Sequence, residues 1–204
     1  MFYLYKIEGA VRVPPDKLTK NLTPVLLEVL REDFEGIVDE DIGVIVAVTK
    51  AKKSGGGKII PGDGAVYFDT EFEVLAFKPE MHEVVEAIIT ELTEFGAFAQ
   101  IGPMEGLIHV SQLMDDYINY DAKQPAFIGK KTGKRLLKDD IVWARIVTIS
   151  LKGNIANSKI GLTMRQPFLG KEEWIKIDKK HEKEKAKKEG KIKAKTKEKE
   201  VKKK

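Results

Sequence analysis

The chain has 204 residues, of which 42% are hydrophobic, enough apolar content for one or two globular domains of ordinary size. It contains no cysteine, which excludes disulfides, thiolate catalysis and cysteine-ligated zinc. Neither a signal peptide nor a long apolar span stands out, so we expect a cytoplasmic protein without membrane insertion.

The formal net charge of +4 is unevenly distributed along the chain. Residues 171–204 hold 16 lysines and 8 acidic residues and carry +8, whereas residues 1–170 hold 20 basic and 24 acidic residues and carry −4. Because this body is mildly acidic, nucleic-acid contacts there must depend on a local patch and on stacking rather than on general attraction to phosphate. The lysine-rich tail has almost no apolar residue to bury, so we expect residues 178–204 to form a basic disordered segment.

The first 80 residues predict an α+β domain with one helix on an antiparallel sheet. The opening MFYLYKIEGAVRVPP is rich in aromatic and β-branched residues and predicts an edge or first strand that ends before Pro14 and Pro15. A helix is expected from Asp16 to Phe34, with Pro24 in its first turn or at a kink, and it ends before Gly36. Its apolar residues recur at three- and four-residue spacing: Leu18, Leu22, Val25, Leu26, Val29 and Leu30.

Two further strands are expected at residues 43–48, GVIVAV, and residues 65–77, AVYFDTEFEVLAF, where apolar residues alternate with polar ones. Between them lies SGGGK, residues 54–58. A phosphate-binding loop requires a glycine five residues before the Gly-Lys pair and a hydroxyl residue after the lysine, and this run has neither. We therefore interpret it as a flexible, charged hairpin tip.

The triplet Asp39-Glu40-Asp41 has the carboxylate spacing of a two-metal nucleotidyl-transfer site. No third carboxylate with an Asn, Lys or Arg phosphate clamp stands nearby in the sequence. We interpret the triplet as a solvated connection. The sequence thus offers no catalytic residue, metal ligand or cofactor site.

Residues 81–177 predict an all-β domain. Five stretches read as short strands separated by turns: HEVVEAIITEL, GAFAQIG, EGLIHVS, DIVWARIVTISL and SKIGLTMR. A small helix-like stretch, SQLMDDYI, lies among them, and Ser111 can cap it. This content in about 90 residues is typical of a small closed barrel of the OB type.

The run EFGAF raises the question of whether Phe95 and Phe98 belong to the core. Strand alternation turns a set of small or apolar residues inward: Ala97, Ala99 and Ile101. Phe98 therefore faces outward beside Gln100. Parity settles neither Phe95, because Gly96 permits a bulge, nor His109, whose neighbours disagree. Exposed rings would suit stacking of unpaired RNA bases, whereas core rings would serve only packing, and spacing alone leaves both readings open.

Residues 81–165 closely resemble the S1-type RNA-binding domain, through EVVEAIITELTEFGAFAQIGPMEGLIHVSQL, LLKDDIVWARIVTIS and SKIGLTMR. The resemblance implies an OB-fold barrel whose RNA-facing side holds two Phe, a His, an Asp late in the fourth strand and an Arg at the start of the fifth. Phe95, Phe98 and His109 match, whereas Ser150 stands at the Asp position and Lys159 at the Arg position. It thus implies RNA binding by Phe95, Phe98, His109 and Lys159, with a basic group retained and the carboxylate replaced by a hydroxyl.

Residues 1–177 resemble the larger of the two stalk subunits of archaeal RNA polymerase, named E, the counterpart of the seventh subunit of eukaryotic RNA polymerase II. The motifs are VRVPP, GKIIPGDGAVYFDTEFEVLAFKPEMHEVVEA and LTMRQPFLGKEEW. This resemblance implies a truncated ribonucleoprotein-like domain, residues 1–80, that docks on the polymerase core, and an S1-type OB-fold domain, residues 81–177. It also implies a noncatalytic role in transcription initiation and elongation. The implied partners are the smaller stalk subunit, named F, the core subunits and nascent single-stranded RNA.

Within this picture, we expect the core-docking tip at the loops around Pro14 and Pro15 and around Pro61, Gly62, Asp63 and Gly64, because glycine permits close approach to another backbone. The alternative function is that of a free S1-domain RNA-binding factor in translation or RNA decay. The first 80 residues do not read as a further RNA-binding repeat, which favours the stalk subunit.

Overall fold

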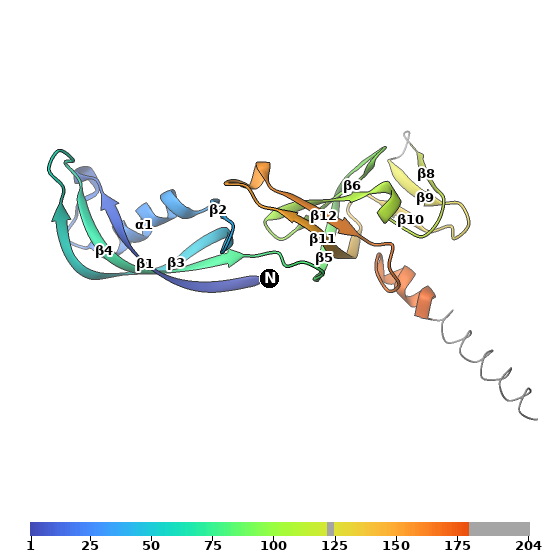
Figure 1. Cartoon of the computed structure of the whole chain (residues 1–204), viewed down its shortest axis with the longest axis horizontal. Helices are drawn as coiled ribbons and strands as arrows, with labels where there is room; N and C mark the ends of the chain where they lie inside the picture. Colours follow the sequence, from blue (N-terminus) through green and yellow to red (C-terminus); the bar gives the residue numbers. More distant parts are fainter. Residues whose placement is uncertain (122–124, 180–204) are drawn as a thin grey trace, which may run out of the picture. The chain divides into compact units, whose positions relative to one another are not determined.

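The computed structural model describes residues 1–121 and 125–179, and the chain forms two compact units (Figure 1). The first unit contains Met1–Glu83 with two short segments, Gly102–Glu105 and Thr148–Ile160. The second contains Val84–Ile101, Gly106–Val147 and the chain from Gly161 onward. In the described ranges, no helix has the length and apolar character needed to cross a membrane.

The first unit is built on an antiparallel sheet of four strands in the order β1-β4-β3-β2 (Figure 1). The strands are β1 (Phe2–Val13), β2 (Val38–Asp39), β3 (Gly43–Ile59) and β4 (Val66–Phe77). β1 pairs with β4 over its whole length, from Phe2 opposite Phe77 to Val13 opposite Val66. The first strand is therefore an edge strand that stops before Pro14, and the α+β class is confirmed.

Helix α1 (Leu22–Phe34) packs its apolar face on this sheet and closes the first core. The core joins residues of the helix and the sheet: Val25, Leu26, Val29, Leu30, Ile45, Val48, Phe68, Phe72 and Val74. Beyond the C-cap, Gly36 has a φ of +85°, a conformation that glycine adopts without strain.

The helix begins later than the apolar spacing predicts. Residues Pro15–Lys17 form a separate 3-10 turn, and Leu18 is extended and exposed rather than helical. Proline at position 24 explains the later start, since a helix from Asp16 would need a hydrogen bond from residue 24 to the carbonyl of Lys20, and proline has no N–H. With the helix starting at Leu22, Pro24 falls in the first turn, where no such bond is required.

The SGGGK run belongs to strand β3, so its interpretation as a hairpin tip was wrong. β3 continues to Ile59, and the pairing with β4 shifts between Lys53 and Gly57, which marks a bulge. A Cβ on Gly57 would lie 2.8 Å from side-chain carbons of both Phe68 and Val66. Glycine therefore serves close packing here rather than a turn, a requirement that composition alone does not reveal.

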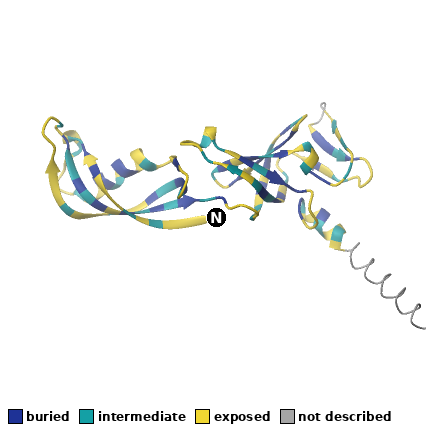
Figure 2. Ribbon diagram, in the orientation of Figure 1, coloured by how far each residue is buried: buried dark blue, intermediate teal, exposed yellow. Residues whose placement is uncertain are grey.

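Five strands from the part of the chain after β4 form a closed barrel in the order β11-β12-β7-β6-β5. The strands are β5 (Val84–Thr93), β6 (Gly96–Ile101), β7 (Met104–His109), β11 (Ile141–Ser150) and β12 (Lys159–Thr163). Buried and exposed residues alternate along them, as Figure 2 shows. The expected inward set is fully buried: Ala97, Ala99 and Ile101. The OB-type barrel is confirmed.

A second small sheet accompanies the barrel and was not anticipated from the sequence. Its strands are β8 (Ile118–Asp121), β9 (Ala126–Gly129) and β10 (Arg135–Leu137), in the order β10-β9-β8. Phe127 and Leu136 are fully buried in it. Strands of three or four residues are too short to show a reliable period, which is why the pattern did not indicate them.

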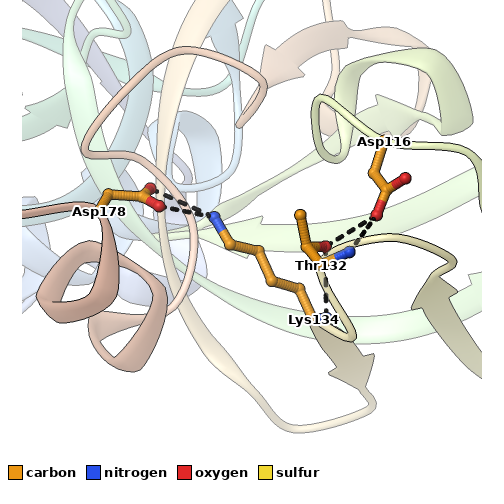
Figure 3. A network of polar contacts seen from close by, with 4 residues as sticks. All are labelled: Asp116, Thr132, Lys134 and Asp178. Carbon is orange, nitrogen blue, oxygen red and sulfur yellow. Dashed lines mark hydrogen bonds and ion pairs between the residues drawn. The ribbon is translucent and has the colours of Figure 1, made fainter. Parts of the chain in front are cut away.

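A short helix at residues 172–179 follows the barrel. Trp174 is buried, and Lys134 Nζ lies 5.5 Å from the centre of its ring. The same ammonium group donates to both carboxylate oxygens of Asp178, at 3.1 and 3.2 Å (Figure 3). Residues 178 and 179, which we expected to belong to the disordered tail, are therefore part of this helix. The rest of the expected tail, from residue 180, lies outside the described residues.

Candidate nucleic-acid interface

An aromatic pair, Phe95 and Phe98, lies at the surface where the turn after β5 leads into β6. Phe98 sits on the outer face of β6, opposite Glu91, and is half-buried, whereas Phe95 is 51% exposed. The ring centroids are 6.0 Å apart and the planes meet at 89°, an edge-to-face arrangement. The two rings pack on each other at the surface, so they are not part of the barrel core.

Gly96 explains how the turn can place Phe95 beside Phe98. A Cβ on Gly96 would collide with the carbonyl oxygen of Ile108, so glycine permits β6 to approach β7 closely. The backbone N–H of Val110 donates to the carbonyl of Phe95 at 2.9 Å and fixes the position of the residue. The glycine thus brings the aromatic pair next to the end of β7.

His109 is exposed at the end of β7 and caps the 3-10 turn Val110–Gln112. Ser111 was expected to fill this capping role, but the histidine side chain does so instead. The backbone N–H of Ser111 donates to His109 Nδ1 at 3.3 Å, and the Ser111 hydroxyl lies 2.9 Å from the same nitrogen. With Nδ1 serving as an acceptor, the neutral ring carries its hydrogen on Nε2, which can donate to a ligand.

Lys159 and Ser150 lie elsewhere on the barrel. Ser150 is the last residue of β11 and Lys159 the first of β12, and both are exposed. The other end of β12, Thr163, donates through its hydroxyl to Gln112 at 2.8 Å, close to the His109 turn. Four residues of strand span about 13 Å, so Lys159 lies at the end of β12 remote from that turn.

The loop at Pro61, Gly62, Asp63 and Gly64 and the loop at Pro14 and Pro15 lie at the same end of the first sheet, because Val66 pairs with both Val13 and Ile59. Two large apolar side chains are exposed beside this tip, Ile59 at 72% and Ile60 at 49%. Gly62 has a φ of +95°, which allows the tight turn there.

Asp63 ties its own loop to the neighbouring strands β1 and β4. Its carboxylate accepts two hydrogen bonds from the Arg12 guanidinium, at 2.8 and 2.9 Å, and one from the Tyr67 hydroxyl at 2.7 Å. These donors, led by Arg12, hold the pKa of Asp63 well below its usual range. Asp63 therefore stiffens the tip from inside.

The Asp39-Glu40-Asp41 triplet occupies a tight turn between β2 and β3. The Asp39 carboxylate accepts the backbone N–H groups of Asp41 and Ile42, at 2.8 and 3.0 Å. This pattern is a side-chain-capped turn, a structural role for the carboxylate. Across residues 1–121 and 125–179, no group of three or more His, Asp or Glu side chains is arranged to hold a metal ion.

Three side chains close to the His109 turn were not singled out from the sequence: Tyr117, Lys131 and Arg165. They line one surface cleft together with Ser111, whose hydroxyl contacts His109. Arg165 belongs to the quoted SKIGLTMR motif, but its place next to the His109 turn depends on the fold, in which the N–H of the preceding Met164 donates to the carbonyl of Gln112 at 2.8 Å.

Two family models match the two parts of the chain. Residues 8–64 match the "SHS2 domain found in N terminus of Rpb7p/Rpc25p/MJ0397", and residues 78–160 match the "S1 RNA binding domain".

Relatives extend the similarity to most of the chain. The DNA-directed RNA polymerase subunit Rpo7 of Sulfolobus acidocaldarius is 38% identical over 175 residues, which are 86% of this chain and 95% of that protein. Rpo7 of Saccharolobus solfataricus is 37% identical over 88% of this chain and its own full length. The DNA-directed RNA polymerase II subunit rpb7 of Dictyostelium discoideum is 28% identical over 72% of this chain and 86% of that protein. These matches confirm the resemblance stated from the motifs, and the chain belongs to the Rpo7 family of DNA-directed RNA polymerase subunits.

Proposed function

We propose that this chain is a noncatalytic stalk subunit that docks on the polymerase core, pairs with the smaller stalk subunit, and binds nascent single-stranded RNA during initiation and elongation. The observation that carries RNA binding is the surface pair Phe95 and Phe98 beside His109 on an S1-type barrel. Family membership supports the polymerase context.

Stacking is the main source of affinity in this proposal. An unpaired base stacked on an aromatic ring contributes about 1 to 3 kcal/mol, and two rings are available here. His109 Nε2 adds a hydrogen-bond donor next to them. Since residues 1–170 carry a net charge of −4, general attraction to phosphate contributes little on this body. Lys159, at the end of β12 remote from the His109 turn, would contact a phosphate of a more distant nucleotide of the bound RNA.

The tip of the first sheet supports docking on the core. Exposed Ile59 and Ile60 form an apolar end beside the loop that the Arg12–Asp63 pair ties to β1. Apolar groups that stay exposed on a stiff loop are suited to burial against another protein.

A second apolar surface supports a partner on the barrel. The outward positions of the β5–β11 pair bring Ile88 opposite Ile141, with Trp143 and Val84 on the same face. These four side chains are between 39% and 55% exposed. We assign this face to the smaller stalk subunit, because neighbouring apolar side chains that stay exposed together often mark a protein–protein contact.

Affinity purification of the tagged full-length chain from its native cells tests the proposal. We expect the large polymerase subunits and the smaller stalk subunit to copurify. Ile60→Asp should lose the core subunits, whereas Ile141→Asp should lose the smaller stalk subunit. If the wild-type chain brought ribosomal or RNA-decay proteins in place of the polymerase, while another tagged polymerase subunit retrieved the enzyme, the free S1-domain factor would replace the stalk assignment.

A further inference from the structure

A cleft of about 510 Å³ opens on the second unit next to the His109 turn. Ser111 of the His109 turn lines it, together with Asp115, Asp116 and Tyr117 from the segment that follows. Lys131 of the β9–β10 loop and Arg165, two residues after β12, complete the polar lining. Clefts that hold small ligands or single residues of a polymer commonly have volumes of about 300 to 1,000 Å³. The cleft therefore has the size for one nucleotide.

The cleft combines an aromatic ring with two cations. Tyr117 is 71% exposed, and Lys131 Nζ lies 5.5 Å from the centre of its ring. Arg165 lines the same cleft with a guanidinium group that is about half exposed. A ring beside cationic donors matches the two parts of a nucleotide, a base that stacks and a phosphate that binds cations.

Two carboxylates also line the cleft, and their partners determine whether they oppose an anion. Asp115 is 77% exposed and pairs with Arg165 at 2.7 Å, an exposed ion pair that water screens and that a phosphate can replace. Asp116 accepts the backbone N–H groups of Tyr117 and Lys131. It also accepts the backbone N–H and the hydroxyl of Thr132 (Figure 3). These donors, led by Thr132, lower the pKa of Asp116 to about 2.

Asp116 thereby acts as the anchor of the cleft. Because it binds the backbone N–H groups of both Tyr117 and Lys131, it holds the backbone of these two residues close together. Gly129 permits this approach, since a Cβ there would lie 2.8 Å from a carboxylate oxygen of Asp116. The arrangement is held by the backbone and does not depend on a ligand.

The cleft and the aromatic pair both adjoin the His109 turn. Ser111 lines the cleft, and its hydroxyl lies 2.9 Å from His109 Nδ1. On the other side of the same turn, Val110 donates its N–H to the carbonyl of Phe95. An RNA strand that runs from the Phe95–Phe98 pair past His109 would therefore reach the cleft next.

We propose that this cleft is an additional RNA subsite, which takes one nucleotide of the bound strand with its base against Tyr117 and its phosphate on Lys131 and Arg165. The inference rests on the proposed RNA binding at the aromatic pair and extends that site. In the bound state Arg165 exchanges Asp115 for the phosphate.

The test measures binding of the full-length protein to fluorescein-labelled oligouridines of about 4 and about 12 nucleotides, within the range of site sizes of OB folds. Tyr117→Ala should weaken binding of the longer RNA about tenfold and leave the shorter one unchanged, while Tyr117→Phe keeps wild-type affinity. Lys131→Gln should lower the slope of log affinity against log salt by about 0.7 for the longer RNA. Lys130→Gln is the matched control, because it removes the same charge from the adjacent exposed residue outside the cleft.

The outcomes separate this inference from the proposed function. If Phe98→Ala weakens binding but Tyr117→Ala binds like wild type and Lys131→Gln behaves like Lys130→Gln, the cleft is not a subsite and the aromatic pair stands. If the folded wild-type protein binds neither oligonucleotide, both proposals fall. Unchanged thermal unfolding of Tyr117→Ala, whose ring is largely exposed, will show that the fold is intact.

Discussion

Phenylalanines in the two units differ in burial although both units are built on antiparallel strands. In the first unit, Phe72 of β4 is 3% exposed under helix α1, and its ring lies 5.3 Å from that of Phe34. In the second, Phe95 and Phe98 pack on each other at the surface. The alternation that turns a ring out of a barrel leaves it exposed unless another element covers that face. Coverage by a helix, rather than residue type, therefore distinguishes the buried Phe72 from the surface pair Phe95 and Phe98.

The largest expected effect comes from removing a covered ring. Phe72→Ala should reduce the free energy of unfolding by about 3 to 5 kcal/mol, because it deletes a buried ring and leaves a cavity beneath α1. Phe95→Ala, at a half-exposed ring, should cost less than about 1 kcal/mol. Chemical denaturation of both variants checks this. Equal losses would show that the surface pair also carries the packing of its unit.

A smaller effect is expected from two neighbouring glycines in β3. Gly57→Ala should destabilise the protein by about 1 to 3 kcal/mol, since the new methyl group meets Phe68 and Val66. Gly56→Ala is the matched control, because nothing lies within 4 Å of a Cβ at that position. Thermal unfolding of the two variants distinguishes a packed strand from a hairpin tip. If both alanines were equally tolerated, this part of β3 would not be packed against β4.

The pH dependence of the second unit is expected to depend on Asp116. Its pKa falls from 3.8 to about 2 in the folded chain, so the folded state binds this proton less readily than the unfolded state. The stabilisation is therefore complete above about pH 4 and is lost as the pH falls from about 4 to about 2. Asp116→Asn should flatten the stability profile over this window, and Asp33→Asn, an exposed carboxylate on α1, serves as the control. A slope that persists in Asp116→Asn would assign the acid sensitivity to other groups.

Much of the fold could be predicted from the sequence because long periodic stretches dominate it. The alternation in residues 65–77 and the three-and-four spacing around Val25 and Leu30 each indicated a correct element. The misses have local physical causes. Pro24 delayed the helix start, and a bulge placed Gly57 inside a strand rather than at a turn.

The candidate site was accessible from the sequence only in part. Parity indicated that Phe98 faces outward, but the position of Phe95 depends on the close contact of Gly96 with Ile108, which is a tertiary feature. The sequence did not indicate Tyr117 and Lys131, because they are 14 residues apart and are brought together by hydrogen bonds of their backbone N–H groups to the Asp116 carboxylate. Short strands and side-chain-capped loops produce no hydrophobic periodicity in the sequence, so side chains that they bring together can be recognised only in the structure.

Binding of single-stranded RNA by the uncovered rings of the barrel can be checked by measuring affinity and stability in parallel for Phe98→Ala. We expect the affinity of the full-length protein for oligouridine to fall by about 1 to 3 kcal/mol, or about 5- to 150-fold, with the free energy of unfolding nearly unchanged. Phe72→Ala should show the reverse, lower stability with RNA binding retained at temperatures where it remains folded. An unaltered affinity in Phe98→Ala, or a weaker affinity that merely follows unfolding, would show that this ring does not bind RNA by stacking.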